Sequence, residues 1–303
     1  PSLLPFAGIA LGALAVLLGG AWVETPESIP ARRGLGLDWF VLNLLALSLL
    51  FVPLERLFAR LREQRIFRVG WRCDLAHFFV NHLLVQVTVL LTMAPATLLL
   101  ADAVVPQLQA RVSALPFTLQ LVLAMFVADL FQYAVHRAMH ELPWLWRFHA
   151  IHHSSEALDW LAGSRLHLID IVLVRAAGFA PLFWLGFDLA PVAAYLAFAS
   201  FQAVFNHANV RFGFRPLRWI VVTPAYHHWH HSSEPSARDK NYAAHLPLID
   251  LAFGTANWPG GWPERYGVDG EAPPPGWLGQ LLWPFRRPAP PAEAGAGGPP
   301  GPR

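Results

Sequence analysis

The sequence predicts an all-α membrane protein with about four transmembrane helices and a helical, histidine-rich cap that faces the cytoplasm. Of the 303 residues, 55% are hydrophobic and only 14% are charged, whereas soluble domains carry about 25% charged residues. The apolar residues form long uncharged runs, which a soluble core does not need. Twelve of the fourteen histidines fall between His136 and His245.

The first 115 residues are expected to form N-terminal transmembrane helices. Residues 1–23 carry no charge and are long enough to cross a hydrocarbon core of about 30 Å. A cleaved signal peptide is the competing interpretation, but the run lacks a basic leader. A second apolar run covers about 37–58, and a third lies between Asp74 and Asp102. Both are expected to span the membrane.

The fourth expected span runs from about Pro116 to His136, and it determines on which side the histidines lie. Six arginines gather between the second and third runs: Arg56, Arg60, Arg62, Arg65, Arg68 and Arg72. The positive-inside rule places this stretch in the cytoplasm, so the chain after His136 also returns there. A later apolar pair, 168–187 and 189–207, forms either a re-entrant hairpin or two short spans.

Several classes of protein and partner are excluded by composition. The single cysteine, Cys73, allows neither an internal disulfide nor a thiolate cluster. The basic residues are not interleaved with aromatic residues, so nucleic acid is not an expected partner. Residues 259–303 are expected to form a C-terminal segment that ends, from Arg286 onward, in a disordered tail rich in proline and glycine.

Eight of the histidines recur at helical spacing. They are His136 and His140; His149, His152 and His153; and His227, His230 and His231. Separations of three and four residues place side chains on one helix face, and neutral imidazole is the commonest nitrogen ligand of metals. Because one ion takes about four protein ligands, eight imidazoles predict two metal ions that share a site.

These clusters also carry a resemblance to a known family. His-Arg-Ala-Met-His at 136–140, His-Ala-Ile-His-His at 149–153 and His-His-Trp-His-His at 227–231 resemble the three histidine boxes of the sterol desaturase and fatty acid hydroxylase superfamily. The likeness covers about residues 116–258, which we expect to be the catalytic region. It implies a membrane non-haem di-iron oxygenase that uses O2 to hydroxylate or desaturate a lipid, such as an acyl chain or a sterol.

The resemblance also implies roles for single residues, with no catalytic group apart from the metal ligands. The implied ligands are His136, His140, His149, His152, His153, His207, His227, His230 and His231, with His167 as an additional candidate. Asp129, Asn206, Asp239 and Asn241 are candidates to hydrogen-bond the ligands from behind. Asp129 lies two helical turns before His136, although it could equally be a helix-end residue solvated at the membrane interface.

The expected cofactors are two iron ions, which zinc could replace. The expected partners are the membrane, a lipid substrate, O2 and a separate electron donor, which could be a ferredoxin, a cytochrome or a reductase. A separate donor is needed because the chain contains no flavin or nicotinamide fingerprint. The arginine stretch could dock an acidic partner, but its effect on membrane topology explains it as well.

Alternatives from other classes remain at this point. A membrane zinc hydrolase would need a His-Glu-x-x-His motif, which is absent. A bis-histidine haem electron carrier needs about two histidines per haem and would leave the clusters unused. A membrane metal transporter would place its ligands in the middle of its spans, whereas these clusters flank them.

Overall fold

The computed structural model describes residues 37–84, 91, 92, 95, 98, 100–212 and 217–286. Its α-helices are α2 (Leu37–Leu57), α3 (Trp71–Leu83), α5 (Pro106–Ser113), α6 (Phe117–Glu141), α7 (Pro143–His153), α8 (Leu168–Leu185), α9 (Leu189–His207), α10 (Pro224–His230), α11 (Pro247–Ala252) and α12 (Trp277–Leu282). Within these residues the only extended pairings are two isolated bridges, Ala59 with Val210 and Ser232 with Tyr266. The all-α fold class is confirmed.

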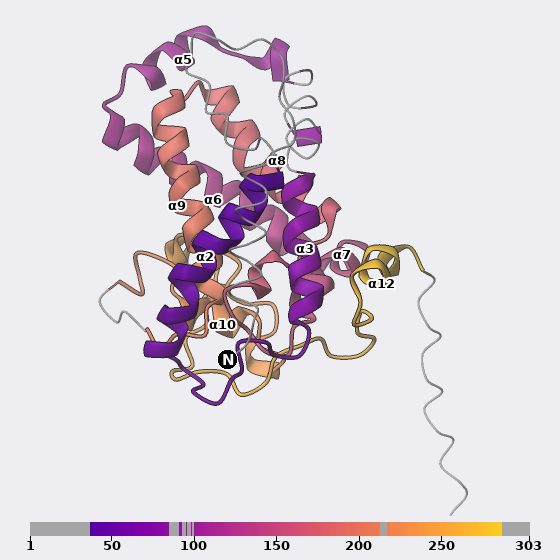
Figure 1. Ribbon diagram of the computed structural model, residues 1–303. Coiled ribbons are helices and arrows are strands. Elements are labelled where there is room, and N and C mark those ends of the chain that lie inside the picture. Colours follow the sequence, from indigo (N-terminus) through magenta and orange to yellow (C-terminus); the bar gives the residue numbers. More distant parts are fainter. Residues whose placement is uncertain are drawn as a thin grey trace, which may run out of the picture.

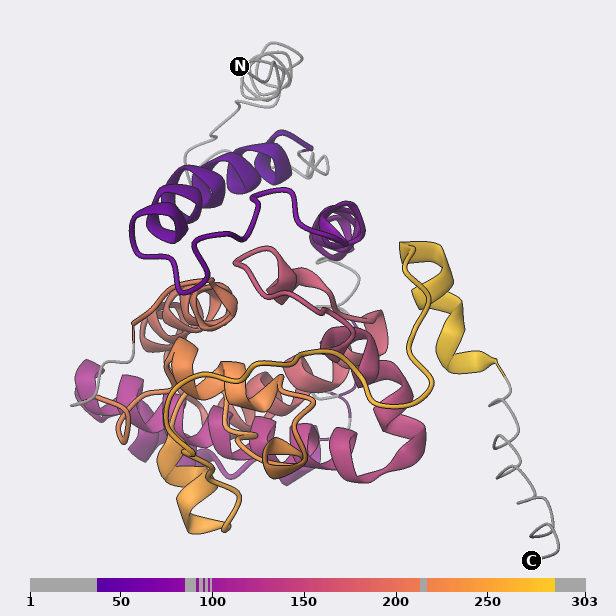
Figure 2. The ribbon, with the colours of Figure 1, turned by 90° about the horizontal axis from the view of Figure 1, so that it is seen from below.

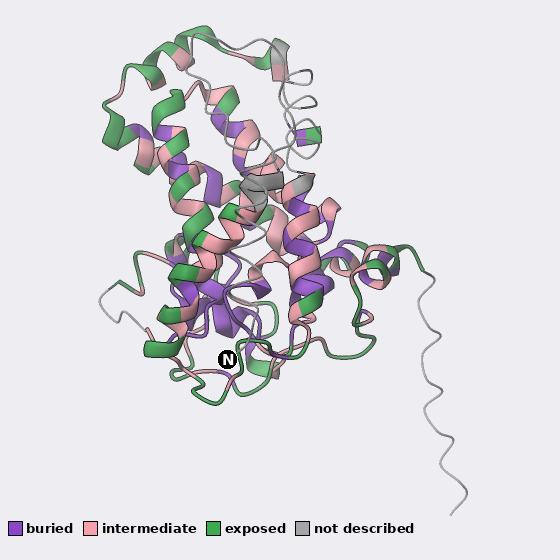
Figure 3. Ribbon diagram, in the orientation of Figure 1, coloured by how far each residue is buried: buried purple, intermediate pink, exposed green. Residues whose placement is uncertain are grey.

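Three of these helices, α6, α8 and α9, are long and apolar enough to cross a membrane. Both α8 and α9 pack against α6 (Figure 1). In Figure 3 the upper parts of these helices are mostly exposed or half-buried, while buried residues gather below them around α10. Apolar helices with exposed sides suggest a multi-pass membrane protein.

The membrane-length helices agree in part with the expected spans. Helix α6 is the expected fourth span, and the later apolar pair forms two helices, α8 and α9. They are separate because Gly186 ends α8 with a left-handed φ of 78°, a conformation that glycine adopts without strain. Helix α2 occupies the second run. The expected first helix at 1–23 and the tail from 287 lie outside the described residues, as does most of the third run after α3.

Proline fixes the sharp turn between α6 and α7. Pro143 occupies the first turn of α7, and Leu142 before it is extended. Proline disfavours a helical conformation in the residue before it, so α6 must end at this point. The turn places the last histidines of α6 beside those of α7.

A buried group of charges fastens the arginine stretch to the histidine region. Arg68 Nη2 lies 2.6 Å from Asp74 Oδ2 and 2.7 Å from Asp159 Oδ1, and Arg165 Nε donates to the other oxygen of Asp74. All four side chains are buried. An apolar cluster joins α2 and α3 to the end of α9. It contains Phe51 of α2, Phe78 of α3 and Ala208, which follows α9.

The C-terminal segment packs on the surface of the helices that precede it in the chain. It runs across the face that carries α10 and ends beside α7 and α3 (Figure 2). Gln280 Oε1 lies 2.8 Å from His77 Nε2 and accepts from Cys73 Sγ at 3.4 Å. Arg147 donates to the carbonyl of Trp283.

Candidate metal centre

Nine buried or half-buried histidines form two groups near the C-terminal ends of α6 and α9. The first group contains His136, His140, His149, His153 and His230, and the second contains His152, His207, His227 and His231. Within each group, the nitrogens that could bind a metal all lie within 4.8 Å of one another. The structure therefore brings together all nine histidines that the sequence singles out as ligands.

Helical spacing divides the histidines of α7 and α10 between the two groups. Residues four apart project from nearly the same side of a helix, whereas adjacent residues project about 100° apart around its axis. In α7, His149 and His153 join the first group while His152 joins the second. In α10 the assignment is reversed, because His227 joins the second group and His230 joins the first.

Acceptors behind the rings fix which nitrogen carries the proton. The Nδ1 atoms of five rings face oxygen acceptors: His136 with Tyr242 O at 2.6 Å, His149 with Asp170 Oδ2 at 2.8 Å, His152 with Arg165 O at 3.1 Å, His207 with Ala203 O at 2.6 Å and His230 with Lys240 O at 2.9 Å. A carbonyl or carboxylate oxygen can only accept. Each neutral ring therefore holds its proton on Nδ1 and directs the lone pair of Nε2 inward.

These lone pairs meet one another inside both groups. Nε2 of His136 lies 3.0 Å from Nε2 of His149, and Nε2 of His207 lies 3.2 Å from Nε2 of His152. All four rings donate through Nδ1, so neither nitrogen of either pair has a hydrogen to share. Two facing lone pairs repel unless a cation lies between them.

The distances fit a metal ion in each group. Two nitrogens bound to one ion at about 2.1 Å lie about 3.0 Å apart at right angles and about 3.4 Å apart at the tetrahedral angle, and the observed contacts of 3.0 and 3.2 Å fall within this range. The buried Nε2 atoms of His140 and His230 have no hydrogen-bond partner among the described residues, although such atoms are normally paired. The two clusters therefore fit a site for two metal ions.

Burial keeps the rings in the form that binds metals. In His152, His153, His227, His230 and His231, burial and then the neighbouring imidazoles lower the pKa well below 6.5. Charging one ring in a dry cluster is costly because its neighbours repel it. These rings are therefore neutral at pH 7, as metal ligation requires.

Comparison with known proteins supports the resemblance seen in the sequence. Residues 121–255, which contain every histidine of both groups, match the family model described as fatty acid hydroxylase. Over these residues the chain is similar to the fatty acid hydroxylase family. The resemblance inferred from the histidine boxes is confirmed.

Three curated relatives show what this chain is similar to. It is 37% identical over 174 residues to ornithine lipid hydroxylase OlsE of Rhizobium tropici, covering 57% of this chain and 52% of the relative. It is 29% identical to alkylglycerol monooxygenase of Caenorhabditis elegans, covering 44% of this chain and 26% of the relative. The Homo sapiens alkylglycerol monooxygenase is 32% identical, with 42% and 28% covered. The chain thus spans about half or less of the length of these relatives, and no solved structure matches it.

Three other histidines of the chain lie outside both groups. His167 Nδ1 accepts from the backbone N–H of Ile169 at the start of α8, and its Nε2 lies 3.1 Å from Leu281 O. Both ring nitrogens of His228 have partners, the Tyr266 hydroxyl and the Ala208 carbonyl. His245 bonds Gln202 Oε1 at 2.7 Å. His167, the additional candidate, is therefore not brought to the ligand groups.

Asp129 does not bond the ring of His136, which the sequence analysis considered as its partner. Its carboxylate accepts the backbone N–H groups of Ala244 at 2.8 Å, His245 at 3.2 Å and Leu246 at 2.6 Å. The ring of His136 is bonded instead to the Tyr242 carbonyl. Asp129 therefore fixes the loop that supplies this carbonyl and acts on His136 only indirectly.

The other three supporting candidates also differ in their contacts. Asp239 Oδ1 lies 3.8 Å from His140 Nδ1, which is too far for a hydrogen bond. Asn241 bonds the backbone at Tyr226 and Asn257. The buried Oδ1 of Asn206 has no partner among the described residues.

Sequence reasoning missed two carboxylates that support the rings, Asp170 by direct contact and Asp250 through a loop. Asp170, the carboxylate on His149, is the only charged residue between Arg165 and Arg175 in an apolar run, and this isolation was the available signal. Asp250 accepts from the backbone N–H groups of Tyr242 and Ala243 at 2.8 and 2.9 Å. It therefore holds the loop that bonds His136.

A pocket opens onto the first group from the face formed by residues 232–239 and 267–270. It has a volume of about 390 Å³, and its lining includes His140, His153 and His230. Its outer wall carries an exposed ion pair between Arg238 and Asp269 at 2.6 Å. Small polar molecules can therefore reach the first group without passing between α6, α8 and α9.

Proposed function

We propose that this chain is an integral membrane non-haem di-iron oxygenase that hydroxylates a lipid with O2. One observation carries the proposal: in each histidine group, Nε2 atoms that hold no proton face one another. The two Nε2 atoms lie 3.0 Å apart in His136 and His149 and 3.2 Å apart in His152 and His207. The relatives' names support the reaction class, since they are hydroxylases and monooxygenases of lipids.

Nine histidines would hold the metals: His136, His140, His149, His153 and His230 around one, and His152, His207, His227 and His231 around the other. Imidazole suits iron as well as zinc. We choose iron because zinc has no redox chemistry. When bound, two iron ions would supply the reductive activation of O2 that cleavage of an unactivated C–H bond needs.

The chain's own residues hold the donor atoms in place. The carbonyls of Tyr242, Arg165 and Ala203 fix three rings through Nδ1. Asp170 does the same for His149 with a full charge, which makes that ring a better donor. Burial of the second group limits the access of water to it, whereas the first group opens onto the pocket lined by His140, His153 and His230.

A lipid is the proposed substrate, and a separate protein is the proposed source of electrons. Two of the relatives are named for an ornithine lipid and for alkylglycerol. Hydroxylation places one oxygen atom of O2 in the new C–OH group and the other in water, so each turnover takes up two electrons and two protons. We propose a ferredoxin, a cytochrome or a reductase as the donor.

The histidine site is proposed to face the cytoplasm. Arg60 of the arginine stretch bonds the Tyr266 hydroxyl, which in turn bonds His228 between the box-three ligands. The arginine stretch and the histidines therefore lie on the same side of the membrane-length helices. The positive-inside rule assigns that side to the cytoplasm.

The geometry disfavours the two alternatives. The axial nitrogens of a bis-histidine haem lie about 4 Å apart on opposite sides of the iron, twice a bond of about 2.0 Å, whereas the Nε2 contacts here measure 3.0 to 3.2 Å. A transporter would bind its metal midway along its spans, but His140 and His207 lie in the last turns of α6 and α9.

Metal content of protein purified anaerobically in detergent tests the proposal. We expect about two iron ions per chain, no haem absorbance, and loss of about one of the two ions in His149→Ala. Iron-loaded protein supplied with reductant and ¹⁸O2 should then transfer ¹⁸O to a lipid. A chain that binds no metal, or one ion that is indifferent to His149, would overturn the di-iron assignment.

A further inference from the structure

The structure divides the arginine stretch into two kinds of residue. Arg60 donates to Tyr266 and Pro263, and Arg68 pairs with Asp74 and Asp159. These two arginines are parts of the fold.

The second kind includes Arg56, Arg62 and Arg65. All three are exposed, and across the described residues none of them forms an ion pair. The fold therefore does not use their charge.

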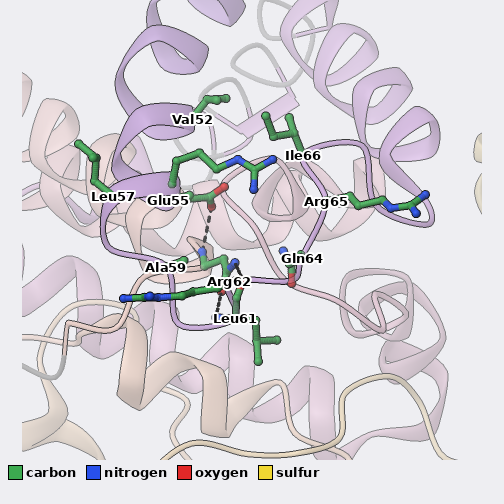
Figure 4. Close-up of a pocket in the computed structure, with 11 residues that line it drawn as sticks. Val52, Glu55, Leu57, Ala59, Leu61, Arg62, Gln64, Arg65 and Ile66 are labelled. Carbon is green, nitrogen blue, oxygen red and sulfur yellow. Dashed lines mark hydrogen bonds between the residues drawn. The ribbon is translucent and has the colours of Figure 1, made fainter.

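These three arginines line one pocket, which has a volume of about 300 Å³ (Figure 4). The pocket lies between the C-terminal end of α2 and the loop that follows it. In Figure 4 the side chains of Arg62 and Arg65 extend to opposite sides of the pocket. Because no ion pair holds either guanidinium, both can turn toward an anion.

Backbone contacts fix the floor of the pocket. The Asn209 carbonyl and side chain accept from the backbone N–H groups of Arg60 and Leu61 at 3.2 and 2.9 Å. Glu55 Oε1 accepts two backbone N–H groups, from Trp160 at 2.8 Å and Asn209 at 2.9 Å. The only carboxylate of the lining is thus committed to the fold, and three arginines against one glutamate give the pocket a net charge of at least +2.

Apolar side chains at the rim show what the pocket faces. Leu57 is 71% exposed and Leu49, two turns earlier on α2, is 77% exposed. Ile66 is another exposed apolar side chain of the pocket lining, and Leu49 extends the exposed apolar surface along α2 beyond the pocket. Basic groups at the end of an apolar helix lie at the level of lipid headgroups, where anionic lipids attract them.

We propose that this pocket binds a phosphate group, and specifically the headgroup of an anionic phospholipid in the cytoplasmic leaflet. Guanidinium groups bind phosphate oxygens through paired hydrogen bonds. A volume of about 300 Å³ is at the lower end of the range for small-ligand pockets, about 300 to 1,000 Å³. A docked protein would instead cover a broad surface of about 800 Å². The bound phospholipid is a ligand here and need not be the substrate.

Direct binding tests the proposal on the full chain in neutral detergent. The probes are short-chain phosphatidylglycerol, the matching phosphatidylcholine and glycerol phosphate. Arg56→Gln/Arg62→Gln/Arg65→Gln removes the pocket charge. Arg72→Gln/Arg111→Gln/Arg265→Gln removes the same charge from exposed positions outside the pocket. Melting temperature and metal content show that each variant is folded.

We expect the parent chain to bind phosphatidylglycerol more tightly than phosphatidylcholine. The pocket variant should bind phosphatidylglycerol about tenfold more weakly, and the control variant should change by less than about twofold. Glycerol phosphate that binds as tightly as the lipid, and with the same arginine dependence, would support the phosphate site but assign it to a soluble ligand.

Three results would overturn the proposal. The first is equal affinity of the parent chain for phosphatidylglycerol and phosphatidylcholine. The second is an equal loss of phosphatidylglycerol affinity in the pocket variant and the control variant. The third is lipid binding that does not depend on the pocket arginines, together with binding of an acidic ferredoxin that does. Each result can be read whether or not the chain binds iron, so failure of this site and failure of the oxygenase assignment are distinguishable.

Discussion

The Nδ1 atom of His149 lies 2.8 Å from the Oδ2 atom of Asp170, and both side chains are buried. In the described part of the chain, no other carboxylate lies within hydrogen-bond distance of a ring in either histidine group. The other anchored rings are bonded to neutral carbonyls. Asp170 therefore gives one ligand a charge that the other anchored rings lack.

Asp170→Asn should weaken metal binding without unfolding the protein. The amide oxygen can still accept from Nδ1 of His149, but the negative charge is lost, and loss of such a partner costs about 10- to 100-fold in metal affinity. Competition with a chelator measures the affinity. Asp269→Asn, on the surface, is the control and should bind as the parent does. An unchanged affinity in Asp170→Asn would remove this carboxylate from the site.

The two groups should lose their metals separately. His140→Ala affects only the first group and His227→Ala only the second, so each variant should retain about one of two metal ions. His167→Gln should retain both, because His167 lies outside the groups. Metal analysis of protein purified anaerobically checks all three. If His140→Ala and His227→Ala both lost all metal, the two groups would have to act as one cooperative site.

Arg68→Met should destabilise the fold strongly. It leaves the buried carboxylates of Asp74 and Asp159 without this partner, and breaking a buried ion pair from one side costs about 3 to 5 kcal/mol. Arg238→Gln, which breaks the exposed pair with Asp269, should cost less than about 1 kcal/mol. Thermal unfolding in detergent compares the two. Equal effects would show that the buried charge group is not needed for stability.

Acid should destabilise the protein partly through His245. Burial lowers its pKa to about 4, while the unfolded chain takes up a proton near pH 6.5. The unfolded state thus binds more protons between these values, and stability falls as the pH falls from about 6.5 to about 4. One such group contributes about 1.4 kcal/mol per pH unit.

Unfolding of the metal-loaded protein over this pH range measures the effect of His245. His245→Gln has no titrating ring, so its stability should fall less steeply than that of the parent by about this slope. Parallel curves for the two proteins would mean that His245 is already protonated in the fold.

The sequence predicted the histidines better than their surroundings. Spacing of three and four residues placed eight rings on helix faces, and His207 followed only from the family resemblance. Spacing along α7 separates the ring of His152 from that of His153, but the group that each ring joins depends on where the rings of α6, α9 and α10 lie, and the spacing along one helix does not contain this information. Hydropathy left open whether the pair after residue 168 spans the membrane, and the structure shows two membrane-length helices.

Contacts between distant residues could not be predicted. Arg68 and Asp159 are 91 positions apart, and no local pattern links them. Asp129 does lie two turns before His136, as the helix period requires. Its carboxylate, however, accepts hydrogen bonds from the backbone of residues 244–246, which are 115 to 117 positions away. Such pairings arise from the path of the loops, which a single sequence does not encode in a readable pattern.

The contact between His77 and Gln280 has a consequence for the order of assembly. The two residues are 203 positions apart, so a ribosome makes α3 long before the segment that satisfies its buried ring and thiol. Helices α6, α8 and α9 can enter the membrane and the histidines can gather while this side of α3 is still open. Residues 277–286 therefore pack onto α3 last, and the part of the protein that surrounds the histidines is complete only after this segment has been synthesised.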